Sequence, residues 1–567
     1  MTSMIQAFNP ADFEAEALNG IVAASHPLAA RAGINVMKRG GNAIDAAIAT
    51  AFALTVVDPC MASIAGRGEM NLYLVDEGKV HNIEFIAVCG ERAREDIYEV
   101  LPRAPGSWWS VKDEANNIGY RSICVPTALA GLCTAQQKFG TMELRDVIEP
   151  SISLAAKGFE VDAKLECNID MDFLKLSRFP ATARILCPGG RPLMRGETLR
   201  MRDYAQTLGR VAEDGPDAFY KGDIADAIAK DLEENGGLVT RKDMETYKPN
   251  IFEPLETSYR DYEVVSGSPE CSGGRLVLQS LNILENFDLK TYRDAHIPTQ
   301  VHILSEVFKQ AFADRLQFEA DPRFTEIPAK GMLSKEYAKK LKQQIAMDKA
   351  SPKTAAGNPW RYEGRAGKAR RRTGLSPGGH ETTHLCAADG KGNMVSLTET
   401  LCSDFGSGVT IPGTGILMNN GMYWFNPVPG TANSIQPGKR HVANMAATFV
   451  LKDGEAMMVA GAAGGRRILT TVTLILTRVL DFDLGVRSLF LPRFHVEDEE
   501  PLEVEQSFYE ETPLAHSAMR ALTAMGHRFE TLPSICIGCM IMRDPETGRL
   551  HGATEPRNLR MGSIQAF

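Results

Sequence analysis

A β-hairpin pattern near residue 382 constrains the fold of this chain more than any other feature. The stretches TTHLCAA and MVSLTETL flank the turn DGKGN, which predicts two antiparallel strands. With the turn centred on Lys391, Thr382 and Thr400 stand equally far from it and are expected to lie opposite each other. Directly opposed residues project to the same side of a sheet, so the two hydroxyls are expected side by side. The pair is interpreted either as an ordinary cross-strand Thr pair or as a nucleophile with a supporting hydroxyl.

A second feature is a glycine-rich junction in the stretch GEAMMVAGAAGGRRIL. An apolar strand is expected to end near Gly461, Gly464 and Gly465, with a helix directly after it. Two glycines at a helix N-terminus present unhindered backbone N–H groups, which suit a developing oxyanion. The same pattern also suits a plain tight turn, so both interpretations stay open at this point.

The rest of the chain predicts a large layered protein. Its 567 residues suggest about two to four domains or one large layered one. The apolar stretch 43–57 predicts a buried helix, since it is too short to span a bilayer and contains Asp45. Residues 298–320 predict a helix with one apolar face, and NLYLVDEGKVHNIEF predicts two strands around a turn at Glu77 and Gly78.

Composition bears on partners and on location. The net charge of −9 gives no reason to expect a nucleic-acid partner, and no like-charged run is long enough to form a tail. The eleven cysteines are scattered without paired spacing, which indicates reduced thiols rather than a disulfide framework. The N-terminal stretch has neither a basic region nor an apolar core of the export type. We therefore expect a cytoplasmic protein without a membrane partner.

Motifs for metals and cofactors are few. The chain has no G-x-x-x-x-G-K-[ST] loop and no H-E-x-x-H pair. Cys536 and Cys539 have C-x-x-C spacing, but they lie in an extended apolar run and no second pair accompanies them. This motif is interpreted as buried strand thiols rather than as a metal or redox site. We therefore expect no metal and no cofactor.

A change of pattern separates two parts of the chain. Residues 351–381 are rich in Gly, Pro, Arg and Lys and have almost no apolar period, which predicts a mobile linker. Its basic run at 368–372 is interpreted as a solvated loop rather than a binding patch. The pattern after the linker is richer in strands than the pattern before it.

Motifs along nearly the whole chain resemble those of the γ-glutamyltranspeptidases. GIVAASHPLAARAGINVMKRGGNAIDAAIATAFALTVVDP is similar to that family's N-terminal signature, and CSGGRLVLQSLNILENFDL, AFADRLQFEADPRF and DPETGRLHGATEPRN follow in the family's order. The hairpin continues into FGSGVTIPGTGILMNN, which also resembles the family. The resemblance implies an α+β fold, the four-layer α-β-β-α sandwich of the N-terminal-nucleophile hydrolases. It further implies a large fragment, 1–381, and a small fragment, 382–567, formed from one precursor.

The resemblance also implies the reaction and its residues. By its position in the motif Thr382 is the nucleophile, and the precursor is expected to cut itself between Glu381 and Thr382. The new α-amino group of Thr382 then serves as the base for its own hydroxyl. Thr400 corresponds to the hydroxyl that supports the nucleophile, and Gly464 and Gly465 correspond to the donors of the oxyanion hole.

The chain departs from the family where a γ-glutamyl unit is normally held. The expected Arg is replaced by Ile86, and the expected Asn after the supporting threonine is replaced by Cys402. The expected Asp is replaced by Trp424, and a Ser-Ser pair is replaced by Ala443 and Asn444. Loss of a bidentate Arg–carboxylate contact costs on the order of 1.5–3 kcal/mol. Such a site is expected to bind a γ-glutamyl group poorly.

Other side chains offer replacement contacts. Trp424 could present an aromatic wall, and Arg67 could restore a carboxylate contact from another direction. Arg466, directly after the glycine pair, adds a possible cation beside the oxyanion hole. Together with Cys402 and Asn444, these three side chains are the candidate substrate contacts.

The leading hypothesis is an autoprocessing threonine amidohydrolase or acyltransferase that acts on a small non-γ-glutamyl amide, as in the oxamate amidohydrolase-like and acylase-like members. The alternative is a true γ-glutamyl hydrolase or transpeptidase for glutathione-type substrates, with its clamp rebuilt from Arg67, Arg466 and Asn444. A third hypothesis is an uncleaved, non-catalytic relative. The two fragments are expected to form a heterodimer after cleavage, and His384 is expected to be structural.

Overall fold

The computed structural model describes residues 9–102, 108–270, 273–292, 297–364, 382–506, 513–557 and 562–567. Glu381, on one side of the predicted cut, lies outside the described residues, and so does most of the predicted linker. Of that linker the structure describes residues 351–364, which include the short 3₁₀ helix Pro359–Tyr362.

Two seven-stranded antiparallel sheets form the centre of the molecule. In spatial order the first sheet contains β1 (Glu14–Ala17), β18 (Leu550–Thr554), β17 (Ile537–Arg543), β13 (Glu455–Ala463), β12 (Thr448–Lys452), β9 (Tyr262–Ser266) and β8 (Glu256–Tyr259). The second contains β19 (Ser563–Ala566), β2 (Gly20–Ala24), β10 (Thr383–Asp389), β11 (Met394–Thr400), β3 (Arg67–Leu74), β4 (Lys79–Phe85) and β7 (Asn250–Phe252). We call these the β13 sheet and the β10 sheet.

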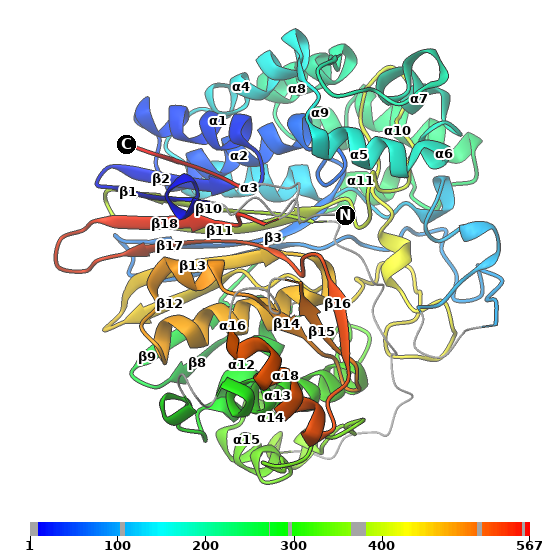
Figure 1. The fold of residues 1–567 in the computed structure, drawn as a ribbon. Coiled ribbons are helices and arrows are strands. Elements are labelled where there is room, and N and C mark those ends of the chain that lie inside the picture. Colours follow the sequence, from blue (N-terminus) through cyan, green and yellow to red (C-terminus); the bar gives the residue numbers. More distant parts are fainter. Residues whose placement is uncertain are drawn as a thin grey trace.

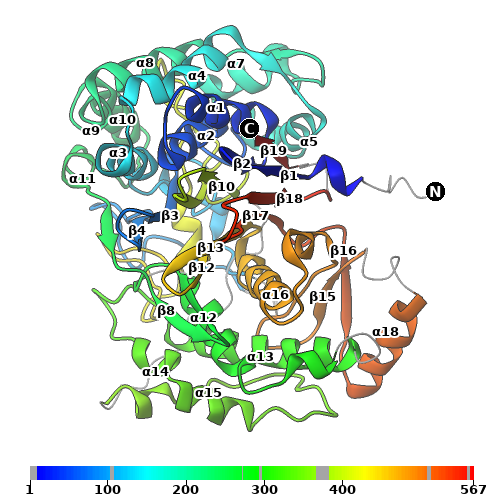
Figure 2. The same ribbon diagram turned by 90° about the vertical axis from the view of Figure 1, so that its left-hand side faces the viewer.

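Helices cover the outer face of each sheet, so the molecule has four layers, α-β-β-α (Figure 1). The β10 sheet is covered by α1 (Pro27–Lys38), α2 (Ala43–Val57), α3 (Ala128–Phe139), α4 (Leu144–Lys157) and α8 (Arg202–Asp214), with α5 (Ala163–Met171), α7 (Pro180–Leu186) and α10 (Asp223–Glu234) beside them. The β13 sheet is covered by α12 (Gly274–Leu284), α13 (Ile297–Phe318), α16 (Ile468–Leu480) and α18 (Pro513–Met525), with α14 (Ala329–Leu333) and α15 (Lys335–Lys342) further out. The view from the side shows the two sheets stacked between these helical layers (Figure 2). The predicted α+β sandwich is confirmed.

The start and the burial of helix α2 both follow from its sequence. Asn42 and Asp45 form a capping box at its N-terminus, which satisfies backbone N–H groups that the first turn leaves unpaired. Every residue of α2 is buried, because the helix lies between the outer helices and the strands β10 and β11. The buried helix predicted for 43–57 is therefore confirmed. Among the helices that the structure describes, none is both long and apolar enough to cross a bilayer.

Three apolar cores separate the layers. One lies between the β10 sheet and its helices, and a second lies between the β13 sheet and its helices. The third lies between the two sheets and includes Ile21, Cys386, Phe449, Val459 and Ile541. Towards one end of the inter-sheet space the apolar side chains give way to polar ones, and there the candidate site lies.

Each sheet contains strands from both predicted fragments. In the β10 sheet, β10 pairs with β2 on one side and with β11 on the other, and β11 pairs with β3. In the β13 sheet, β1 pairs with β18 and β9 pairs with β12. The boundaries 1–381 and 382–567 therefore describe a division of the chain and not two separate bodies. Whether the chain is cut there stays a prediction.

Candidate active site

Three rows of side chains cross the inner face of the β10 sheet. The observed register pairs Thr383 with Glu399, as the predicted hairpin requires. The row nearest the apolar core contains Cys386, Ser396, Asn71 and Asn82, and the next contains His384, Thr398, Glu69 and Glu84. Continuing the register by one residue gives the last row, Thr382, Thr400, Arg67 and Ile86. The predicted hairpin and its register are therefore confirmed, and Thr382 lies one residue before the paired strand β10.

Thr400 is fixed by the segment that follows it. Its Oγ1 accepts a hydrogen bond from the backbone N–H of Cys402 at 2.9 Å. Cys402 has φ +88, in the left-handed region that non-glycine residues rarely adopt. The Asn expected there from the family adopts this conformation more readily than Cys does. The strained turn thus supports the position of the Thr400 hydroxyl.

Arg67 lies directly opposite Thr400 and is 2% exposed. Its Nε donates to Cys402 Sγ at 2.9 Å, and its guanidinium lies 5.3 Å from the ring centre of Trp424. Trp424 is held in turn by its Nε1, which donates to the Cys402 carbonyl at 2.9 Å. No carboxylate of the described residues pairs with Arg67, and its Nη1 has no hydrogen-bond partner. A buried guanidinium without an anion is costly, so its environment suits an anionic ligand.

His441 lies beside the same cluster. Its ring is 6.1 Å from the Trp424 ring, and its Nδ1 lies 3.1 Å from the Val442 carbonyl, which requires the tautomer with hydrogen on Nδ1. Burial lowers the pKa of His441 well below its ordinary value, and the charge of Arg67 lowers this pKa further. The neutral ring therefore keeps an acceptor at Nε2, which has no partner among the described residues.

Ile86 follows Arg67 in the last row, and its apolar side chain has apolar neighbours. It packs with Ala443 and Met445 in a small buried cluster. Next to Ala443, Asn444 accepts a hydrogen bond from Arg315 at 2.7 Å through Oδ1, and its Nδ2 has no partner within the described part of the chain. The position of the expected guanidinium is thus filled by hydrocarbon, with one spare amide donor nearby.

The glycine junction lies over the same end of the β10 sheet. Ser396 Oγ donates to the Ala460 carbonyl of β13 at 3.2 Å, and a Cβ added to Gly461 would lie 2.2 Å from the His384 ring. The row of Ser396 thus meets Ala460 of β13, and the next row, that of His384, meets Gly461. The strand and the nucleophile row approach the same edge of the inter-sheet space.

Gly464 and Gly465 adopt conformations that favour glycine, with φ +152 and φ +60. A Cβ on Gly464 would lie 2.4 Å from Cys536 Sγ and 3.0 Å from the Ile535 carbonyl. The predicted strand-to-helix junction is confirmed, with one difference: a 3₁₀ turn, Gly465–Arg467, precedes α16. Within this turn the backbone N–H of Arg467 donates to the Gly464 carbonyl at 3.2 Å.

Arg466 is less suited to a substrate than the sequence suggested. Its Nε lies 3.2 Å from Glu497 and its Nη2 lies 3.2 Å from Glu503. These carboxylates raise the pKa of Arg466 above its ordinary value, chiefly through the charge of Glu497. Its positive charge is therefore balanced inside the protein.

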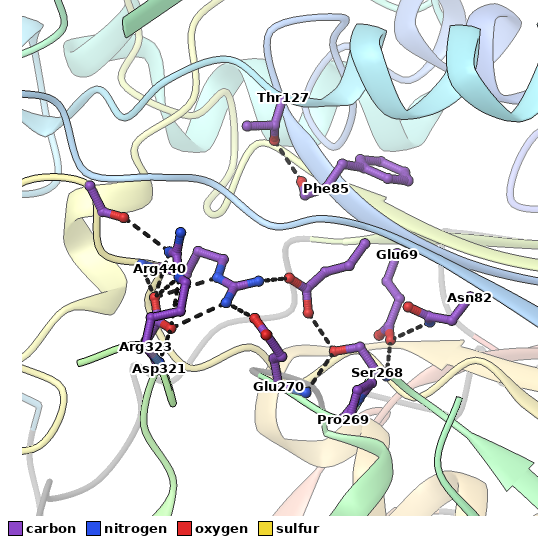
Figure 3. Close-up of polar contacts among 12 residues, drawn as sticks. Glu69, Asn82, Phe85, Thr127, Ser268, Pro269, Glu270, Asp321, Arg323 and Arg440 are labelled. Atoms are coloured by element: carbon purple, nitrogen blue, oxygen red, sulfur yellow. Dashed lines mark hydrogen bonds and ion pairs between the residues drawn. The ribbon is translucent and has the colours of Figure 1, made fainter. Parts of the chain in front are cut away.

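A buried ion-pair network centres on Arg440 and reaches Glu84, in the row next to that of Thr382 (Figure 3). Arg440 pairs with the carboxylates of Glu84, Glu270 and Asp321. Arg323 adds a second guanidinium to Asp321 at 2.7 Å. The three carboxylates that surround Arg440 are thus engaged within the protein.

Glu69 is the fourth carboxylate of this region, and Figure 3 shows it beside Asn82 and Ser268. It accepts hydrogen bonds from Asn82 Nδ2 at 2.9 Å and from the Ser268 backbone N–H at 2.7 Å. Ser268 donates its hydroxyl to Glu84 as well, which links Glu69 to the Arg440 network. These contacts give Glu69 protein donors in place of a substrate ammonium.

Glu399 lies on the opposite face of the hairpin, next to Thr400 in sequence and opposite Thr383. It is 1% exposed, and neither carboxyl oxygen has a hydrogen-bond partner in the part of the chain that the structure describes. Burial raises the pKa of Glu399 well above its ordinary value, and the charge of Asp58 raises this pKa further. Burial without a hydrogen-bond donor therefore favours the neutral form of this carboxyl group.

The two cysteines of the C-x-x-C motif do not face each other as partners. Cys539 lies on β17 opposite Gly461, and its Sγ is 3.7 Å from Cys386 Sγ on β10. Cys536 lies instead against Gly464. Both thiols are buried, as predicted, but only Cys539 of the two lies in a strand, since Cys536 stands directly before β17. The contact between Cys539 and Cys386 joins positions more than 150 residues apart, so no local pattern predicts it.

The structure therefore brings together Thr382, Thr400, Arg67, Cys402 and Trp424, with Asn444 nearby, and it leaves Arg466 paired elsewhere. Sequence reasoning missed His441, Glu399 and the partner of Cys539. His441 follows the basic pair KR in the sequence, and nothing in that pattern marks it as a neighbour of Trp424. The roles of these side chains stay predictions.

Comparison with known proteins gives a consistent result. Residues 29–564 match the family described as Gamma-glutamyltranspeptidase. The Acylase ACY 1 proenzyme of Pseudomonas sp. (strain V22) is 37% identical over 536 residues, which cover 94% of this chain and 91% of the relative. The Glutathione hydrolase proenzyme of Bacillus subtilis (strain 168) is 35% identical over 546 residues, with 95% and 90% covered.

Solved structures show the same fold. The crystal structure of cephalosporin acylase from Bacillus halodurans superposes with a TM-score of 0.87 at 28% identity. The superposition covers 100% of this chain and 99% of the acylase chain. The similarity therefore extends over both sheets and both helical layers, and not only over the strands of the candidate site.

Proposed function

This chain belongs to the γ-glutamyltranspeptidase family, and we propose that it is a self-cleaving amide hydrolase whose nucleophile is Thr382. The relatives at 37% and 35% identity are both named as proenzymes, which supports maturation by cleavage. The hairpin register, which sets Thr400 across from the start of β10, and the packing of Gly461 against the His384 ring, three residues before Gly464, support the assignment of the residues.

Maturation follows from the position of Thr382 directly before β10. Its Oγ attacks the carbonyl carbon of Glu381, the Glu381–Thr382 amide becomes an ester, and the former amide nitrogen becomes the α-amino group of Thr382. Water then hydrolyses the ester and leaves a carboxylate on Glu381. Thr382 is 5% exposed, so this step takes place in a site that already excludes most water.

Turnover uses the same hydroxyl with a new base. The α-amino group accepts the Oγ proton of Thr382 while the Oγ attacks the substrate amide carbon. The oxyanion that forms is stabilised by the backbone N–H groups of Gly464 and Gly465. The protonated α-amino group then gives its proton to the leaving amine, and the acyl group stays on Thr382 as an ester. Water hydrolyses this ester, and an acceptor amine could take the acyl group instead.

The substrate class follows from Arg67, and this is the observation that carries the proposal. The guanidinium is buried, and among the described residues its Nη1 has no partner and no carboxylate pairs with it. It lies on β3, opposite Thr400 and two strands from β10, which follows the nucleophile. A carboxylate on the acyl group would supply the missing anion and could accept a bidentate contact. We therefore assign a half-amide of a dicarboxylic acid as the substrate.

The site offers less to the ammonium of a γ-glutamyl group. Trp424 occupies the position of the expected Asp, and the carboxylates of Glu84, Glu270 and Asp321 are engaged by Arg440. A bound ammonium would therefore be desolvated without a matching anion, which costs several kcal/mol. The site thus favours an acyl group with a carboxylate and no amino group over the γ-glutamyl group.

The test compares p-nitroanilides of four acyl groups on the mature protein: butanoyl, succinyl, glutaryl and γ-glutamyl. Intact-mass spectrometry first establishes whether the chain is cut before Thr382. We expect two fragments, with a succinyl or glutaryl anilide hydrolysed faster than the butanoyl and γ-glutamyl anilides. Fastest turnover of the γ-glutamyl anilide would support the alternative, a true γ-glutamyl hydrolase. A single uncut mass would contradict the proposed nucleophile.

A further inference from the structure

Three soft ligand atoms lie together between the two sheets. His384 and Cys386 are neighbours on the inner face of β10, and Cys539 faces them from β17. Cys386 Sγ lies 3.4 Å from His384 Nε2 and 3.7 Å from Cys539 Sγ. All three atoms lie within 4.8 Å of one another, and all three side chains are buried. The cluster takes one cysteine of the C-x-x-C motif and excludes the other.

The separations match those of ligands around one tetrahedral metal ion. With zinc–sulfur bonds of about 2.3 Å and a zinc–nitrogen bond of about 2.0–2.1 Å, two sulfurs stand about 3.8 Å apart and a sulfur and a nitrogen about 3.6 Å apart. The observed 3.7 Å and 3.4 Å agree with these values. The contacts of the two thiols to backbone carbonyls are long, 3.6 Å from Cys386 and 3.9 Å from Cys539, so these hydrogen bonds are weak.

The imidazole is oriented for such a role by its surroundings. His384 Nδ1 lies 2.8 Å from Thr398 Oγ1, which fixes the ring and directs Nε2 at the sulfurs. Gly461 has no side chain where the ring passes, since a Cβ there would lie 2.2 Å from it. Ser396 Oγ lies 3.4 Å from Nε2 and places a fourth polar atom at the cluster. Ring position, space and donor set thus all agree with one bound ion.

We propose that His384, Cys386 and Cys539 bind a zinc ion between the sheets. Two thiolates and a neutral imidazole balance the charge of Zn²⁺, so the ion can be buried without an unpaired charge. Binding converts both thiols to thiolates and releases two protons to solvent. The ion would tie β10, which begins directly after Thr382, to β17 of the facing sheet. The proposal depends on neither the nucleophile nor the substrate class.

The experiment measures metal in protein purified without chelators from cells grown with zinc. We expect inductively coupled plasma mass spectrometry to find about one zinc per chain in the wild type. Cys386→Ser and Cys539→Ser should each lose most of this zinc, whereas Cys536→Ser, which changes the other cysteine of the C-x-x-C motif, should keep it. Unchanged zinc in the first two variants, or a wild type without stoichiometric metal, would overturn the proposal.

A second measurement covers variants that fail to fold. Wild-type protein from cells grown with Co²⁺ in place of Zn²⁺ should show thiolate-to-cobalt absorption in the near ultraviolet and tetrahedral bands in the visible. The Cys536→Ser protein should show the same spectrum. A wild-type protein without these bands would contradict the site whatever the variants do.

Discussion

Arg67 lies directly opposite Thr400 on the neighbouring strands β3 and β11. In the same row Ile86 lies one strand further from Thr382, at the position where the family places its guanidinium. A guanidinium that starts at Arg67 is therefore roughly 4.8 Å, one strand spacing, closer to the nucleophile. Under the proposed function, the positive charge that meets the substrate carboxylate thus starts closer to the reacting carbon.

Replacing Thr382 tests the nucleophile. Thr382→Ala should leave one intact polypeptide without activity, because no hydroxyl remains to attack the Glu381 carbonyl. Thr382→Ser keeps a hydroxyl and should still be cut, which makes it the matched control. Intact-mass spectrometry reads both results. A Thr382→Ala chain that still splits before residue 382 would show that another residue is the nucleophile.

Replacing Arg67 tests the carboxylate contact. Arg67→Met keeps the length of the side chain and removes its charge, so kcat/KM for a glutaryl or succinyl anilide should fall about 10- to 150-fold, which corresponds to the roughly 1.5–3 kcal/mol of a charged hydrogen bond. Turnover of the butanoyl anilide should change little, which separates loss of the contact from loss of fold. An equal fall for all acyl groups would contradict a role in substrate recognition.

Restoring two residues of the family tests the lost clamp. Ile86→Arg combined with Trp424→Asp returns a guanidinium and an anion to their family positions, and γ-glutamyl turnover should rise above that of the wild type. Ile86→Arg alone should instead lower the melting temperature, because it buries a charge against Ala443 and Met445. Steady-state kinetics on the γ-glutamyl anilide decide the question. No gain in the double variant would count against the clamp argument.

Gly464→Ala tests the oxyanion site. A Cβ there meets Cys536 Sγ at 2.4 Å and forces the backbone away from φ +152, so kcat should fall about 10²- to 10³-fold. Gly454→Ala is the control: it has φ +82 in the β12–β13 turn, and no atom lies near its added Cβ. The control should lose some stability and keep its kcat. Similar kinetics in the two variants would show that Gly464 has no special role.

Glu399 makes stability depend on pH. The unfolded chain ionises at the ordinary value of 4.5, whereas burial raises the pKa of folded Glu399 well above this, so folding takes up a proton at higher pH. Its contribution to stability is therefore fully present below about pH 4.5 and declines as the pH rises. Glu399→Gln removes this dependence and should raise the melting temperature more at pH 8 than at pH 4.5. An equal shift at both values would show that Glu399 is ionised in the folded protein.

Local patterns predicted the elements well because their causes are local. The capped apolar run of α2, the hairpin around Lys391 and the strand before Gly464 all depend on residues close in sequence. The row that contains Thr382 and Thr400 followed from the hairpin alone. Its extension to Arg67 required the pairing of β11 with β3, which joins positions more than 300 residues apart. That pairing lies beyond any periodicity in the sequence.

The partners of buried polar groups could not be predicted in the same way. Arg466 follows the glycine pair and is a candidate cation for the site from the sequence, but Glu497 and Glu503 reach it from a distant segment. Cys539 contacts Cys386 because the two sheets stack face to face. The C-x-x-C spacing is a local pattern and does not predict a contact between two sheets. The family resemblance predicted the roles of the residues. The structure shows which charged side chains are already paired within the protein.

Both sheets contain strands from both predicted fragments, and this affects how the cleaved protein can refold. An uncut chain forms both sheets by an intramolecular search, because every strand is tethered to its partner. After a cut before Thr382, the same pairings of β10 with β2 and of β12 with β9 join two molecules, so their recovery from denaturant becomes a second-order process. Folding is therefore expected to precede cleavage. At high dilution the uncut precursor should refold efficiently, whereas the two separated fragments should not.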